Sequence, residues 1–85
     1  ITPNFDGFND SWIPVLDLDT EIVVSILNRW GEKEYRYQGN SLGFSWNGFA
    51  NWGKKHELPS SDYYYIIEFS NENYPAKTGV ITLIR

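Results

Sequence analysis

The hydrophobic residues of this chain are gathered in short segments that have the pattern of β-strands. Segment 21–29 is apolar and β-branched, which favours a strand that is buried on both sides for part of its length. Segment 11–16 is weaker because it contains Pro14, and proline belongs on a sheet edge. We predict five strands, at 11–16, 21–29, 33–37, 63–69 and 80–84, with one further short strand around 44–46.

Turn-forming residues separate these segments and leave no stretch long enough for a good helix. The link Trp30-Gly31-Glu32 has the pattern of a tight hairpin, with Gly31 supplying a positive φ angle. The pattern therefore predicts an all-β antiparallel sandwich of about seven strands, with no helix beyond a single turn. We expect its core to contain Val24, Ile26, Trp30, Trp46, Tyr65, Ile67 and Leu83.

Composition narrows the class of protein. A chain of 85 residues fits one domain, and the absence of cysteine excludes a disulfide framework, a thiolate metal site and a cysteine nucleophile. The chain also lacks methionine, so we expect residues 1–85 to be a piece of a larger protein. Its net charge of −4 argues against a nucleic-acid partner, and no apolar stretch reaches the length of a transmembrane helix.

No residue pattern indicates catalysis. The single histidine, His56, lies in the polar run 54–57, where we expect a solvated loop. Asp17, Asp19 and Glu21 alternate between two predicted strands, which is more typical of a solvated link than of paired acid–base carboxylates. We therefore predict that the domain is not an enzyme.

The densest polar motif is the run 4–10 near the start of the chain. Its side-chain oxygens surround a glycine, as they do in part of a calcium-binding loop, but the spacing is incomplete and no bidentate glutamate follows. Asn and Asp side chains also stabilise turns through local hydrogen bonds. We favour a structural loop without a cofactor and keep calcium as the alternative, with ligands from Asn4, Asp6, Asn9 and Asp10.

Aromatic residues in the loop-rich middle of the chain suggest a second function. Exposed rings there would stack on sugars, and Trp52, flanked by Asn51 and Gly53, is the best candidate for an exposed ring. The competing interpretation is that these rings fill the core of a small sandwich. A carbohydrate-binding module is therefore the alternative function.

Five blocks of residues, in a characteristic order and spacing, identify a family that the chain resembles. They are Thr2-Pro3-Asn4-x-Asp6-Gly7-x-Asn9-Asp10-x-Trp12, Ile26-x-Asn28-Arg29-Trp30-Gly31-Glu32, Trp46-x-Gly48, Leu58-Pro59-Ser60 with Tyr63-Tyr64-Tyr65, and Thr78-Gly79-Val80-Ile81-Thr82-Leu83-Ile84-Arg85. The chain resembles the gliding-motility-associated C-terminal domain of Bacteroidetes, the type B sorting domain of the type IX secretion system. The resemblance covers essentially the whole chain.

The resemblance implies a fold, a role and a set of partners. The fold would be an immunoglobulin-like β-sandwich. The role would be that of a C-terminal sorting signal, which carries cargo domains lying N-terminal to it from the periplasm to the cell surface or the medium. The partners would be the type IX translocon and an outer-membrane protein of the PorP/SprF-like kind.

Two segments are the candidates for recognition by such a partner. The first is the hairpin, Asn28, Arg29, Trp30 and Gly31, where the Arg29 guanidinium would bind a partner carboxylate or pair with an acid of its own sheet. The second is the terminal strand, Val80, Ile81, Thr82, Leu83, Ile84 and Arg85. This strand would offer a sheet edge to a receptor strand or be a fully paired core strand.

Overall fold

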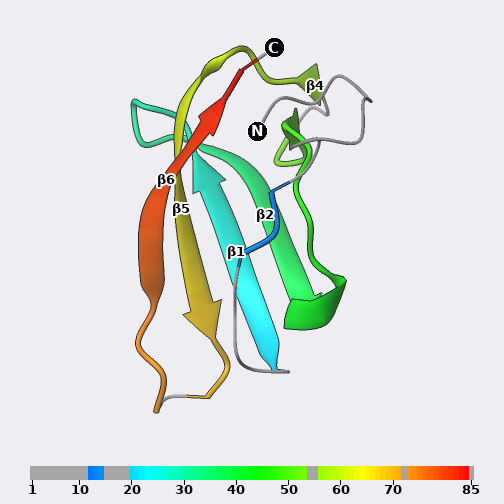
Figure 1. Cartoon of the computed structure of the whole chain (residues 1–85), viewed down its shortest axis with the longest axis vertical. Coiled ribbons are helices and arrows are strands. Elements are labelled where there is room, and N and C mark those ends of the chain that lie inside the picture. The colour runs from blue at the N-terminus through cyan, green and yellow to red at the C-terminus, as the bar shows by residue number, and fades with distance from the viewer. Residues whose placement is uncertain (1–11, 15–19, 54–55, 72, 85) are drawn as a thin grey trace.

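A four-stranded antiparallel sheet forms one layer of the fold (Figure 1). The computed structural model describes residues 12–14, 20–53, 56–71 and 73–84. The sheet has the order β2-β1-β5-β6, so the first two strands and the last two form neighbouring hairpins. Its strands are β1 (Glu21–Leu27), β2 (Lys33–Asn40), β5 (Ser61–Phe69) and β6 (Lys77–Leu83).

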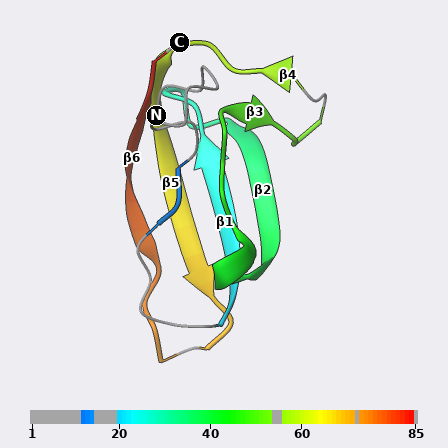
Figure 2. The ribbon, with the colours of Figure 1, turned by 45° about the vertical axis from the view of Figure 1, so that its right-hand side comes forward.

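The segment between β2 and β5 covers one face of this sheet (Figure 2). It contains the single-turn 3-10 helix η1 (Ser41–Gly43) and the short strands β3 (Phe49–Ala50) and β4 (His56–Glu57), which pair antiparallel. Trp12 joins this second layer through two backbone hydrogen bonds to Trp46, of 2.6 and 2.9 Å. The described residues thus form six strands in two antiparallel sheets, which confirms the all-β sandwich class.

The core lies between the two layers because each long strand turns alternate apolar side chains inward. On β1 these are Ile22, Val24 and Ile26, each at most 1% exposed. The second layer supplies Phe44 and Trp46, and Tyr63 from β5 packs on Trp46 with ring centroids 5.7 Å apart. Large rings thus fill the space between two small sheets, as the composition suggests.

The core prediction is right for the strand residues and wrong for Trp30. Val24, Ile26, Trp46, Ile67 and Leu83 are buried, and Tyr65 is half-buried against the same cluster. The side chain of Trp30 is 70% exposed because β1 ends at Leu27 and Trp30 lies in the turn beyond it. An aromatic residue three positions past the last strand residue has no inner face to occupy.

Several predicted strand bounds also differ from the structure. β1 stops two residues early, because Asn28 and Arg29 belong to the hairpin turn. β2 and β5 extend beyond the predicted segments, and β6 begins earlier than predicted, at Lys77, but ends one residue earlier, at Leu83. Segment 44–46 contributes only the bridge at Trp46, and the strands of that region are β3 and β4, so His56 lies on a strand rather than in a loop. Of segment 11–16, the structure describes residues 12–14, where Trp12 forms the bridge.

Candidate functional site: the hairpin end of the sandwich

The turn between β1 and β2 is tightly hydrogen-bonded. The N–H of Gly31 donates to the carbonyl of Asn28 at 3.0 Å, and the N–H of Asn28 donates to the carbonyl of Glu32 at 2.9 Å. Gly31 has φ of +82°, as predicted from the sequence. A three-residue loop that ends in a left-handed glycine is a common hairpin connection, and glycine adopts this conformation without a steric cost.

The side chain of Asn28 is the centre of a hydrogen-bond network. Its Oδ1 accepts from the N–H groups of Trp30 and Glu32, both at 3.0 Å. Its Nδ2 donates to the carboxylate of Glu32 at 3.3 Å and to that of Glu34 at 3.2 Å. One amide side chain therefore fixes the backbone of the turn and also engages the two nearest acids.

Replacing Asn28 with alanine is expected to loosen this turn without unfolding the sheet. The variant loses four partly exposed hydrogen bonds, so we expect its free energy of unfolding to fall by about 1 to 2 kcal/mol. Amide hydrogen exchange at Trp30 and Glu32 should accelerate far more than exchange at Val24. Unchanged protection of those two amides would show that the turn does not depend on Asn28.

The Arg29 guanidinium stacks on the neighbouring indole. Its carbon lies 4.2 Å from the centroid of the Trp30 ring, a cation–π arrangement. Among the residues that the structure describes, no carboxylate pairs with Arg29, because Glu32 and Glu34 are engaged by Asn28. The alternative in which Arg29 pairs with an acid of its own sheet therefore finds no support in this part of the chain.

A second cation–aromatic pair lies at the same end of the molecule. The Lys33 ammonium lies 4.5 Å from the centroid of the Trp52 ring, and Trp52 is 53% exposed, as the sequence predicted. The Asn51 side chain holds this segment to β2, since it accepts from the N–H of Arg36 at 2.7 Å and donates to the carbonyl of Arg36 at 2.8 Å. The N–H of Trp52 also donates to the carbonyl of Glu34 at 3.2 Å.

Sequence reasoning missed the roles of Lys33 and Asn51. Lys33 lies in an alternating strand, and Asn51 looks like an ordinary turn residue. Asn51 is fifteen residues from Arg36, so no local pattern links the two. The only local signal for the role of Asn51 is its residue type, because asparagine side chains readily form hydrogen bonds with backbone groups.

Shallow grooves flank the Trp30 indole on two sides. One is lined by Glu34, His56 and Leu58 and the other by Arg29, Ser60 and Ser61, and both share Asn28, Pro59 and Tyr63 with Trp30. Tyr63 is fixed there because its hydroxyl donates to the carbonyl of Pro59 at 2.7 Å. His56 Nε2 lies 3.8 Å from a Glu34 carboxylate oxygen on the wall of the first groove. The exposed Trp30 side chain therefore contributes to both concave surfaces.

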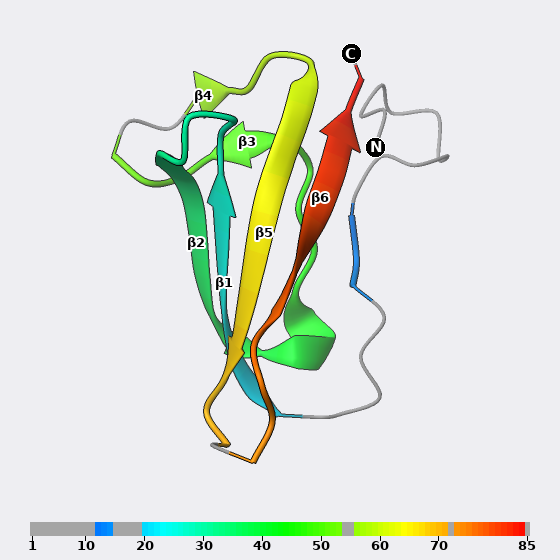
Figure 3. The same cartoon turned by 90° about the vertical axis from the view of Figure 1, so that its left-hand side faces the viewer.

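The terminal strand ends close to this hairpin end of the sandwich (Figure 3). β6 is last in the order of the four-stranded sheet and pairs with β5, with Leu83 opposite Ser61. Ile81 and Leu83 are buried in the core, whereas Val80 and Ile84 are more than half exposed. β6 is therefore an outer strand of the sheet, and its inward side chains are part of the core. Arg85 lies outside the described residues.

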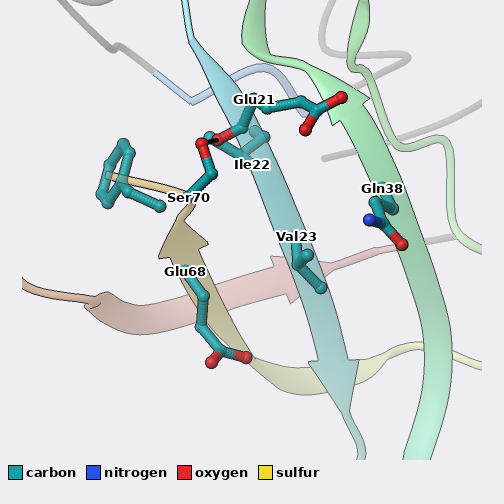
Figure 4. Close-up of a pocket in the computed structure, with 7 residues that line it drawn as sticks. Glu21, Ile22, Val23, Gln38, Glu68 and Ser70 are labelled. Carbon is teal, nitrogen blue, oxygen red and sulfur yellow. Dashed lines mark hydrogen bonds between the residues drawn. The ribbon is translucent and has the colours of Figure 1, made fainter. Parts of the chain in front are cut away.

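A further hollow lies on the outer face of the sheet, at the end opposite the hairpin turn (Figure 4). Glu21, Val23, Gln38 and Glu68 contribute to its lining, and Ser70 donates its hydroxyl hydrogen to the carbonyl of Glu21 at 3.2 Å. The carboxylates of Glu21 and Glu68 point in different directions in Figure 4. Across residues 12–14, 20–53, 56–71 and 73–84, no three metal-ligating side chains come together.

The candidate calcium loop lies outside the described residues. Asn4, Asp6, Asn9 and Asp10 all fall in segment 1–11, so the choice between a structural loop and a calcium site stays a prediction. No helix in the described part of the chain is both long enough and apolar enough to cross a membrane.

Comparison with known proteins identifies the family. The family model described as CHU_C Type IX secretion signal domain matches residues 1–83, nearly the whole chain. No curated protein and no solved structure matches the chain significantly. The matched family supports a secretion-signal role, and the match adds nothing for the carbohydrate-binding alternative. The chain therefore belongs to the CHU_C type IX secretion signal domain family.

Proposed function

We propose that this domain directs its parent protein through the type IX secretion system by way of the periplasm. The family match over residues 1–83 carries this proposal, and it implies contact with the secretion machinery and export to the cell surface or the medium. The cargo is made of domains that lie N-terminal to this one. The domain acts as a folded surface that a protein partner reads, and it has neither a catalytic role nor a cofactor.

The partners are the type IX translocon and an outer-membrane protein of the PorP/SprF-like kind. Two surfaces of the domain serve as their docking sites, the hairpin 28–31 and the terminal strand 80–85. The hairpin offers an exposed Trp with a stacked Arg, two residue types that are enriched among the residues that dominate binding energy at interfaces. The terminal strand is last in the order of the four-stranded sheet, which is the position where a strand of the partner would pair with it.

An export assay tests the proposed function. A periplasmic reporter protein is fused ahead of this domain and expressed in a bacterium that has a type IX system, together with the outer-membrane partner protein from the domain's own organism. We expect the reporter on the cell surface or in the medium, because the fusion carries the signal that the machinery recognises.

The matched control is the same reporter without the domain, which should stay in the periplasm. A second control is the fusion in a strain whose translocon gene is deleted, which should also retain the reporter. If the intact and folded fusion remains in the periplasm of the competent strain, the sorting function is wrong.

A further inference from the structure

We propose that the hairpin end of the sandwich docks on an acidic protein surface, through its two exposed tryptophans and the cation stacked on each. Arg29, Trp30, Lys33 and Trp52 form this surface, which we call the cation–tryptophan surface. The proposal deepens the proposed function, because it states the chemistry of the partner that this end of the domain contacts. It also brings Trp52 into the docking surface, in place of a sugar-stacking role.

Within the described residues, both cations remain available to bind a carboxylate of a partner. Neither the Arg29 guanidinium nor the Lys33 ammonium pairs with an acid within the described part of the chain. A cation held over an indole keeps most of its hydrogen-bond donors for a partner, and arginine in particular can bind a carboxylate through two parallel N–H groups. The stack also reduces the number of conformations that each long side chain gives up on binding.

The acids nearest to these cations are already engaged. Asn28 donates to the carboxylates of both Glu32 and Glu34, and His56 lies 3.8 Å from the second of them. The two carboxylates thus have hydrogen-bond partners other than Arg29.

The form of the surface favours a protein partner over a lipid surface. The two cations of this surface, Arg29 and Lys33, give weak attraction to anionic lipid, for which clusters of four to eight basic residues are typical. By contrast, the Asn28 network fixes the backbone of the turn at Trp30, and Trp30 contributes to the lining of two neighbouring grooves. A fixed aromatic side chain beside grooves is the kind of surface that a complementary protein surface packs against.

Charge-reversal variants in the export assay test the proposal. The variants are Arg29→Glu and Lys33→Glu, and the matched control is Lys77→Glu, which makes the same charge change at an exposed site at the far end of β6. We expect each of the first two to lower export by about tenfold or more, because an unpaired like charge facing the acidic partner is strongly unfavourable. Lys77→Glu should export as the unchanged domain does. Circular dichroism and melting temperature establish that each variant is folded.

Binding to the purified outer-membrane partner protein gives the second measurement. The affinity of the unchanged domain should fall as salt is raised, and Trp30→Ala and Trp52→Ala should each weaken binding by about tenfold or more. Equal export by all three charge-reversal variants, while the unchanged domain is exported, would overturn the proposal and leave the sorting function standing. Flotation with phosphatidylglycerol vesicles that depends on Arg29 and Lys33 would overturn it in favour of a lipid surface.

Discussion

Replacing Trp46 with alanine should bring the domain close to unfolding. The Trp46 side chain is 1% exposed, its ring packs on Tyr63 and Tyr35, and its indole N–H donates to the carbonyl of Phe49 at 2.9 Å. Truncation of a buried tryptophan typically costs about 3 to 5 kcal/mol. A domain of this size is stable by roughly 4 to 13 kcal/mol, so the loss is a large share of the total.

Urea unfolding followed by circular dichroism measures this loss. Trp52→Ala is the matched control, because the same truncation at a half-exposed ring should change stability by about 1 kcal/mol or less. Burial explains the difference, since the Trp46 side chain is 1% exposed and the Trp52 side chain is 53% exposed. Comparable losses at both sites would mean that Trp46 is not the centre of this core.

The sandwich was predictable from sequence because its strands have strong local patterns. β1 and β5 contain consecutive runs of β-branched and aromatic residues, and the inward side chains of both strands are buried. The segment from Ser41 to Glu57 has a weaker pattern, in which aromatic and polar residues alternate only over 44–47, and its two short strands were not predicted. They owe their position to the Trp46 ring and to hydrogen bonds from distant residues, such as those between Asn51 and Arg36.

The candidate site was predictable only in part. The glycine at position 31 identifies the hairpin, and the structure confirms its positive φ angle. Residue type alone does not determine the burial of Trp30, because tryptophan occurs both on strands that face a core and in exposed turns. The contact between Lys33 and Trp52 depends on how the second layer folds back on β2, which is a long-range effect that no local pattern records.

Gly79 is the site where sequence and structure lead to opposite predictions. It lies within β6, where β-propensity alone predicts that valine would be stabilising. Gly79 is opposite Tyr65 on β5, however, and the Tyr65 ring lies across it, so that an added Cβ would be 2.5 Å from ring atoms. The ring also packs on Trp12, with centroids 4.7 Å apart, so it has little room to move.

We therefore expect Gly79→Val to lower the free energy of unfolding by about 1 to 3 kcal/mol, the usual cost of overpacking. Thermal and urea unfolding measure the change, and Thr78→Val, at an exposed neighbouring position, should be neutral or slightly stabilising. A double variant with Tyr65→Ala isolates the cause, because the valine should cost much less once the ring is absent. A stabilising Gly79→Val, or the same cost with and without Tyr65, would show that the ring does not set the requirement for glycine.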